Sequence, residues 1–404
     1  MTSELPKLRH VDVRPVNHQG MPMIVLNDPL RLRRAALLVP QMAGPLLALM
    51  DGTRDLAALQ EGFLHHTGVR IDPEEVEALI SGLDDGFLLD NQRFRQAKAA
   101  AMNVYRTGPF RPPSIAGSGY PADPWELKRA LDSYCRDAAT VETGAADNVV
   151  AAISPHIDYA RGWRTYAHTW TRLKRAVQEA ELIILLGTDH AGNPGSITLT
   201  RQSYATPWGI LPTDIALVDQ MAGVLGEDAA FAAEQYHLGE HSIELASVWL
   251  HYAAEGQPKR VLPVLCGQHT PLLLGGATAS RAWEAIDLLA KAAAKQRTLV
   301  VAAGDLSHVG PAFGDKAPLD EAAKAGIQAF DDRYLKVACT GQPEAMTDYA
   351  LIHGDPTRIC GSAPIHFLSR IVPGSAGSVV DYQQCAADDT FGSLVSIAGV
   401  SFRK

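Results

Sequence analysis

The chain has 404 residues, of which 47% are hydrophobic and 20% are charged. These values exclude disordered, collagen-like and coiled-coil chains, and the length suggests two or three compact units. Because 36 Lys and Arg residues face 45 Asp and Glu residues, the net charge is −9, which argues against nucleic acid or anionic membranes as partners.

The first 95 residues are predicted to form a small winged-helix-like domain. A short strand, three helices and a second short strand are expected in turn over residues 22–26, 41–50, 56–65, 73–83 and 86–90. The third helix has the clearest start signal. Asp72 provides an N-cap, Pro73 occupies the first helical position and Glu75 completes a capping box.

Residues 96–112 are predicted to be a linker, because the helical periodicity lapses there and residues 107–113 are rich in proline. A second domain is expected over 113–404, and a helix capped by Asp123 lies near its start. Four buried strands that alternate with helices are predicted at 149–153, 182–186, 261–265 and 299–303. This alternation predicts an α/β fold with a mostly parallel sheet flanked by helices on both faces.

The location of the protein is also expected from the sequence. No apolar run approaches the roughly 18 residues of a membrane-spanning helix, and the first ten residues lack the apolar stretch of a secretion signal. The five cysteines are odd in number and contain no CxxC pair, which fits a reducing compartment. We expect a cytoplasmic protein that does not bind membranes.

Three of the predicted strands run directly into segments that contain both Asp and His: residues 154–158, 187–190 and 304–308. Open α/β sheets bind their ligands at the carboxyl ends of the strands. We therefore expect His156, His190 and His308 to meet there, together with Asp305. One such histidine alone would more often be a loop residue bonded to the backbone, but three strand ends with the same chemistry favour a shared site.

Imidazoles are the commonest ligands of zinc, iron and copper, and a thiolate or carboxylate ligand supplies negative charge. Cys360 is a candidate third ligand, because an apolar helix is predicted from about Pro364 and its amino end favours a thiolate. Asp305 competes for this role, or else orients a histidine or caps a turn. His241 opens another helix and is a candidate acid or base, with its pKa lowered by the helix end.

The remaining histidines have weaker claims. His269 follows the strand at 261–265 and is a candidate for the rim of the site. Structural roles are assigned to the histidines that lie in helical or loop patterns without a partner: His168, His251, His353 and His366. No nucleotide-binding, serine-hydrolase or HExxH motif occurs in a fitting context.

Eight motifs in order resemble the Memo family, whose bacterial members are called AmmeMemoRadiSam system protein B. They are residues 113–121, 154–156, 186–190, 204–207, 240–244, 262–265, 305–308 and 359–361. The Memo fold is similar to class III extradiol dioxygenases, which are non-haem iron enzymes that cleave catechol rings. Residues 14–90 also resemble the PqqD-like domains that hold precursor peptides, although a docking or dimerisation module without a peptide ligand is an equal alternative.

The resemblance implies a metal site whose ligands match His156, His190 and Cys360. Its other pocket positions match His241, Asp305 and His308. In the ring-cleaving relatives, the residues that resemble His241 and His308 act as acid/base and as hydrogen-bond donor to bound dioxygen. The chain departs from common family residues at Ala191, Ser307 and Ile115, and the missing donors favour iron over copper.

Three functions follow as hypotheses. The first is a non-haem Fe(II) redox enzyme that acts on an unknown small molecule or peptide, together with the radical-SAM partner that the family name implies. The second is a non-catalytic metal-binding scaffold whose N-terminal domain binds a peptide or protein. The third is a zinc hydrolase with His241 as the general base.

Overall fold

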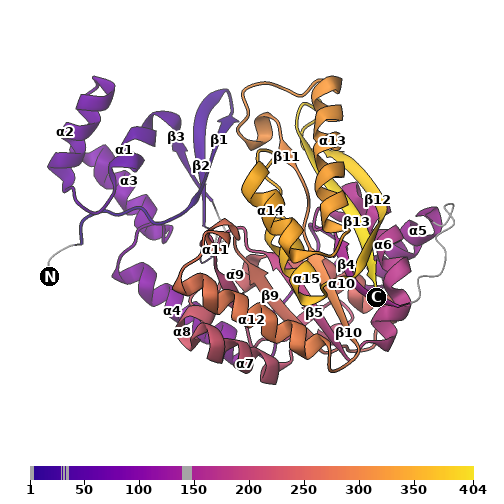
Figure 1. Cartoon of the computed structure of the whole chain (residues 1–404). Coiled ribbons are helices and arrows are strands. Elements are labelled where there is room, and N and C mark those ends of the chain that lie inside the picture. The colour runs from indigo at the N-terminus through magenta and orange to yellow at the C-terminus, as the bar shows by residue number, and fades with distance from the viewer. Residues whose placement is uncertain (1–3, 29, 31, 33–35, 139–147) are drawn as a thin grey trace. The chain divides into compact units, whose positions relative to one another are not determined.

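The computed structural model describes residues 4–28, 30, 32, 36–138 and 148–404 (Figure 1). The chain divides into two compact units, Met1–Gly108 and Pro109–Lys404. Among the described residues, no helix combines the length and the apolar character needed to cross a membrane.

A three-stranded antiparallel sheet opens the first unit, with β2 (Met21–Asn27) between β1 (Asp12–His18) and β3 (Leu37–Pro40). The predicted strand at 22–26 is the central strand β2. The sequence did not indicate β1, because nearly all its residues are exposed on both faces and so give no alternating pattern.

Helices make up the rest of this unit: η1 (Gln41–Ala43), α1 (Gly44–Leu49), α2 (Leu56–Thr67), α3 (Pro73–Asp85) and α4 (Gln92–Thr107). The capping box at Asp72 is present at the start of α3, as predicted. The strand predicted at 86–90 is wrong, because Leu89 forms only an isolated bridge with Leu8, and the positive φ of 56° at Phe87 interrupts the extended backbone. Most of the predicted linker is helical, since α4 is capped by Asn91 and rich in alanine.

The second unit is built on an eight-stranded sheet whose main order is β11-β13-β4-β10-β5-β9-β6, with β12 paired to β13. Its strands are β4 (Val149–Ser154), β5 (Leu182–Thr188), β6 (Ile197–Leu199), β9 (Val261–Cys266), β10 (Thr298–Ala303), β11 (His308–Val309), β12 (Ala376–Ala386) and β13 (Leu394–Arg403). A separate hairpin joins β7 (Tyr204–Thr206) to β8 (Gly209–Leu211). The neighbours β4, β10, β5 and β9 are parallel, and β13 and β6 flank them antiparallel.

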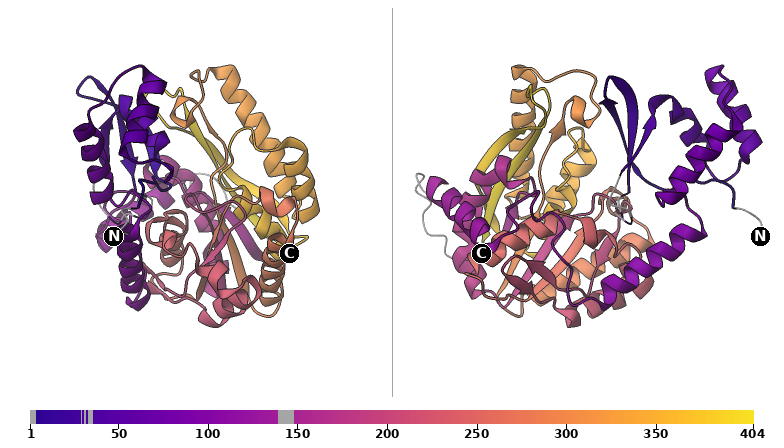
Figure 2. Two further views of the ribbon diagram at one scale, coloured as in Figure 1. Left: turned by 90° about the vertical axis from the view of Figure 1, so that its left-hand side faces the viewer. Right: turned by 180° about the vertical axis from the view of Figure 1, so that it is seen from behind.

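Helices cover both faces of this sheet (Figures 1 and 2). They are α5 (Pro124–Ala138), α6 (Tyr159–Glu179), α7 (Ile215–Leu225), α8 (Glu227–Phe231), α9 (Tyr236–Gly239), α10 (Ser242–Ala253), α11 (Thr270–Leu273), α12 (Ala277–Ala293), α13 (Glu321–Ala338), α14 (Pro343–His353) and α15 (Ser362–Ile371), with the short η2 at Pro311–Phe313.

Successive residues of the central strands point into two different cores. Ile184 and Leu186 face the core formed with α7, α12 and α15, whereas Ile183 and Leu185 face the core formed with α5, α6 and α10. Burial on both faces explains the continuous apolar runs of these strands. The predicted α/β fold with a mostly parallel, helix-flanked sheet is confirmed.

Candidate metal centre

Three imidazoles meet beyond the carboxyl edge of the sheet. His156 follows β4, His190 follows β5 and His241 immediately precedes α10. One ligand atom from each ring lies within 4.8 Å of the others. Nitrogen ligands bind zinc at about 2.0–2.1 Å, so a single ion of this kind needs only small side-chain shifts to reach all three rings.

His156 is the buried member of the cluster. Its Nδ1 lies 3.0 Å from the carbonyl oxygen of Ala303, at the end of β10, and its backbone N–H donates to Asp305 Oδ1 at 2.7 Å. A carbonyl accepts but does not donate, so Nδ1 carries the proton and Nε2 is left to face a ligand. The β10 strand thus orients a histidine that belongs to the neighbouring strand.

Glu240 orients the other two rings. One of its oxygens lies 2.9 Å from Nδ1 of His190, and the other lies 3.3 Å from Nδ1 of His241. The same carboxylate accepts backbone N–H bonds from His241 and Ser242, at 2.8 and 2.9 Å. These contacts leave Nε2 of both rings available to an ion, the arrangement that a carboxylate imposes on metal-binding histidines.

Cys360 joins the cluster from a fourth segment, just before α15. Its Sγ lies 3.2 Å from Nε2 of His156 and 3.6 Å from the carbonyl oxygen of Asp305. Two glycines allow this approach, since a Cβ on Gly304 would lie 2.4 Å from the Cα of Gly361. The turn before α15 therefore packs directly on the end of β10, which brings the thiol to the imidazoles.

The imidazole of His156 and the thiol of Cys360 each favour the charged form of the other. Burial alone would lower the pKa of His156, but Cys360 and Asp305 raise it to about 9. Burial alone would raise the pKa of Cys360, but the positive charges of His156 and His308 and hydrogen bonds lower it to about 6. Cys360 is therefore mostly a thiolate at neutral pH, which is the form that binds metals.

Glu240 and the two histidines beside it form a second charged group. Burial opposes the ionised form of Glu240, but His190 and His241 hold the pKa of its carboxyl well below the usual range. The pKa of His241 falls to about 4. This direction agrees with the sequence prediction but the cause differs, because burial is the largest contribution and Glu240 opposes it.

The three rings of the cluster differ in their exposure to solvent. The side chain of His156 is 2% exposed, whereas those of His190 and His241 are 37% and 40% exposed. A substrate can therefore reach the rings of His190 and His241 more readily than that of His156.

The other predicted residues lie around this group. Asp305 holds the backbone of His156, and its Oδ2 lies 3.8 Å from Nε2 of that ring, so its position agrees with the orienting role. His308 bonds through Nδ1 to the carbonyl of Leu306 at 2.9 Å and is half-buried. It is one of the groups that lower the pKa of the Cys360 thiol.

Several histidines lie outside the cluster. His269, predicted at the rim, is buried against His366, with ring centroids 4.9 Å apart. His251 bonds to Thr206 at 2.7 Å and to the carbonyl of Gly256 at 3.2 Å, which is a structural role.

Sequence reasoning missed Glu240 and Arg111 as residues that shape the site. Arg111 is fully buried and donates to the carbonyl oxygens of His237 and Glu240, at 2.7 and 2.8 Å. It also forms an ion pair with Glu244. The only local signal was an acid directly before His241, whereas nothing near Arg111 in the sequence indicates a contact 129 residues away.

The lowered thiol pKa gives a direct prediction for Cys360. In chelator-treated protein, iodoacetamide should label Cys360 with a midpoint near pH 6, because thiolates react and the pKa is about 6. Burial raises the pKa of the other four thiols, Cys135, Cys266, Cys339 and Cys385. Mass spectrometry of the peptides would follow each cysteine separately.

The internal control is Cys339, which is partly exposed and has a pKa raised to about 11. Added metal should protect Cys360 and leave the labelling of Cys339 unchanged. Labelling of both cysteines with the same pH profile would contradict the ionised state of Cys360.

Fold and site together define an α/β protein with a histidine cluster that could hold a metal ion at the carboxyl edge of its sheet. A family model described as Memo-like protein matches residues 111–401, and the chain belongs to this family. A MEMO1 family protein of Aquifex aeolicus is 27% identical over 401 residues, which cover 98% of this chain and 99% of the relative.

Two further relatives bear the same family name. The Thermus thermophilus protein is 26% identical over 335 residues, or 83% of this chain and 94% of the relative. The Methanosarcina acetivorans protein is 25% identical over 296 residues, or 72% of this chain and 97% of the relative. The resemblance found from the motifs is therefore confirmed at the level of the family.

Proposed function

We propose that this chain is a non-haem iron protein with an oxidative function, whose metal is held by His156, His190 and Cys360. The observation that carries the proposal is the orientation of the donors. The Nδ1 atoms of both histidines are engaged by Ala303 and Glu240, and the Cys360 sulfur lies 3.2 Å from Nε2 of His156. Two imidazoles and a thiolate form a donor set that suits iron, zinc or copper.

Iron is favoured over the other two metals by the resemblance to the extradiol dioxygenases, in which a carboxylate stands at the position of Cys360. Bound iron would supply redox chemistry with dioxygen. A thiolate donates more electron density than a carboxylate and stabilises the ferric state. The expected reaction is therefore an oxidation that differs from ring cleavage.

The protein's own residues supply orientation and proton handling. Glu240 fixes the planes of His190 and His241. His241 is neutral at physiological pH, since its pKa is about 4, and can accept a hydrogen bond from a hydroxyl group of the substrate. The substrate, a small molecule or a peptide segment, would enter over the exposed edges of His190 and His241.

A second candidate function, a metal-binding scaffold, is favoured by the N-terminal unit. Its strands β1 and β3 each pair only with β2 among the described residues of their sheet. Edge strands of this kind can add an extended peptide as a further strand. The peptide would then be presented to a partner enzyme, for which we propose the radical-SAM class.

Oxygen consumption by anaerobically purified, Fe(II)-loaded full-length protein tests the proposal. We expect uptake above that of free iron, stimulated by a panel of catechols and other phenols, and lost in His190→Ala because the ion is no longer held. His353→Ala, on α14, is the matched control and should retain the uptake. No uptake at full iron occupancy would overturn the oxidative function and favour the scaffold. Ester hydrolysis by the zinc-loaded protein, without oxygen uptake by the iron-loaded protein, would point to a hydrolase.

A further inference from the structure

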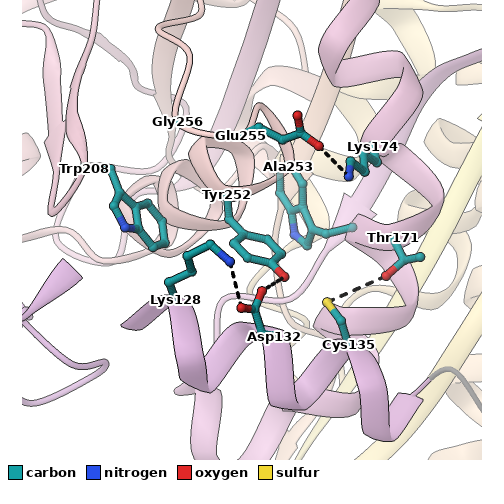
Figure 3. Close-up of a pocket in the computed structure, with 11 residues that line it drawn as sticks. Lys128, Asp132, Cys135, Thr171, Lys174, Trp208, Tyr252, Ala253, Glu255 and Gly256 are labelled. Carbon is teal, nitrogen blue, oxygen red and sulfur yellow. Dashed lines mark hydrogen bonds and ion pairs between the residues drawn. The ribbon is translucent and has the colours of Figure 1, made fainter. Parts of the chain in front are cut away.

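The larger unit contains a cavity whose lining, drawn in Figure 3, includes no residue of the histidine cluster. Its volume is about 550 Å³, and its lining is mostly apolar. Pockets that bind small molecules span about 300–1,000 Å³ and combine apolar walls with a few polar groups. Helix α10 begins at the histidine cluster and ends at this cavity, and its 12 residues are about 18 Å long.

Aromatic rings form the walls of the cavity. Trp208, in the turn between β7 and β8, is fixed by a bond from its Nε1 to the carbonyl of Pro124 at 3.1 Å. Its ring lies 6.3 Å from that of Tyr252, at an angle of 38°. Trp170 also lines the cavity, with its own Nε1 bonded to Ser154 at 3.0 Å. The indole N–H groups of both tryptophans are thus satisfied, and Trp208, which is partly exposed, offers ring surface for stacking, whereas Trp170 is buried.

A hydrogen-bonding edge lies beside these rings. Lys128 donates to one oxygen of Asp132 at 2.7 Å, and the hydroxyl of Tyr252 donates to the other at 2.6 Å (Figure 3). Both residues line the cavity, and their side chains remain 54% and 32% exposed, respectively. The cavity therefore presents a donor and an acceptor side by side.

The charges of the lining are balanced. Lys174 pairs with Glu255 at 2.7 Å, as Lys128 pairs with Asp132. Two lysines and two carboxylates sum to no net charge, which disfavours a polyanion or a polycation as the ligand. Glu255 also has a left-handed backbone with φ 55°, an uncommon conformation for a residue other than glycine, in the turn where its carboxylate reaches Lys174.

We propose that this cavity binds a neutral, planar heteroaromatic molecule that carries an adjacent donor and acceptor on one edge, the pattern of an amide or a nucleobase. The ring stacks on Trp208 and Tyr252. The edge of the ligand bonds to Lys128 and Asp132, where the ligand acceptor meets the ammonium group and the ligand N–H meets the carboxylate.

Titration of the full-length protein with three probes tests the proposal. Adenine, cytosine and nicotinamide are neutral and planar and have the required edge, whereas 6-dimethylaminopurine lacks the N–H donors of the adenine amino group. We expect at least one of the three to bind, and 6-dimethylaminopurine to bind at least about tenfold more weakly than adenine if adenine is the ligand. Trp208→Ala and Asp132→Asn should each weaken binding by about tenfold or more.

Trp125→Ala is the matched control for the loss of a tryptophan. Trp125 lies on α5, the helix that carries Lys128 and Asp132, but it is 76% exposed and does not line the cavity. This substitution should leave the affinity unchanged. A second readout is Cys135, which lines the cavity and should be protected by the ligand from N-ethylmaleimide, while Cys339 should not.

Two results would overturn the proposal. One is that none of the three probes binds at concentrations up to about 10 mM. A dissociation constant of about 10 mM corresponds to a binding free energy of about 3 kcal/mol. The other is binding that Trp208→Ala leaves unchanged, since the ligand would then occupy another place.

Discussion

Replacement of His156 by alanine is expected to lower the affinity of the protein for Fe(II) by more than about 100-fold. This effect exceeds the roughly 10- to 100-fold loss typical of a residue that only orients a ligand. His156 is buried and pre-oriented by Ala303, so its loss removes a ligand that is already fixed in place. Cys360→Ala should show a loss of similar size, because the thiolate supplies the negative charge of the donor set. Competition with a chelator of known affinity measures both.

Two controls separate this effect from general damage. His353→Ala removes an exposed histidine at the end of α14 and should leave metal affinity unchanged. His241→Ala tests whether His241 is a metal ligand or a group that contacts the substrate. A loss of iron affinity as large as that of His156→Ala would make His241 a ligand. Full iron content in Cys360→Ala would remove the cysteine from the metal site.

Loss of the buried Arg111–Glu244 ion pair should destabilise the fold much more than loss of an exposed ion pair. Glu244→Gln is expected to lower the free energy of unfolding by about 3–5 kcal/mol, because it leaves the Arg111 charge buried and unpaired. Glu244 also accepts bonds from the backbone N–H of Ser114 and the hydroxyl of Tyr120, at 2.8 and 2.6 Å. Urea unfolding followed by circular dichroism would measure the change.

The control is Glu227→Gln, whose partner Arg201 forms an exposed pair, with side chains 63% and 41% exposed. Exposed pairs contribute about 0–1 kcal/mol, so this variant should remain close to the parent protein. Equal effects of the two substitutions would contradict the importance of burial for Glu244.

The same pair sets an expected response to acid. The pKa of Glu244 is lowered in the folded chain relative to its ordinary value of 4.5, so its ionised form stabilises the fold above that pH. This contribution is lost as the pH falls from about 4.5 through the folded-state pKa. Glu244→Gln has no such group and should show a shallower loss of stability in this range.

The sequence was sufficient to predict the parallel part of the sheet and the convergence of its strand ends. Strands buried on both faces leave continuous apolar runs, as at residues 182–186, and the position of His156 and His190 just after such runs placed them at one edge. Cys360 was a candidate from its place before a predicted helix, but the residues alone left it in competition with Asp305, because its proximity depends on a contact between Gly304 and Gly361, which are far apart in the chain.

Other features had no local signal. The strand β1 is exposed on both faces and lacks an alternating pattern. The helix α4 consists of residues with high helix propensity but has a single buried residue, so periodicity did not identify it. Arg111 falls within the predicted linker. Its role was not predictable from the neighbouring sequence, because it depends on contacts with the distant residues Glu240 and Glu244.

The most direct test of the account is anomalous diffraction at the iron absorption edge from crystals of the Fe(II)-loaded protein. We expect one strong peak beyond the carboxyl ends of β4 and β5, within bonding distance of Nε2 of His156, Nε2 of His190 and Sγ of Cys360, at roughly 2.0–2.4 Å. A peak elsewhere in the chain, or iron bound to none of these three atoms, would contradict the proposed metal centre.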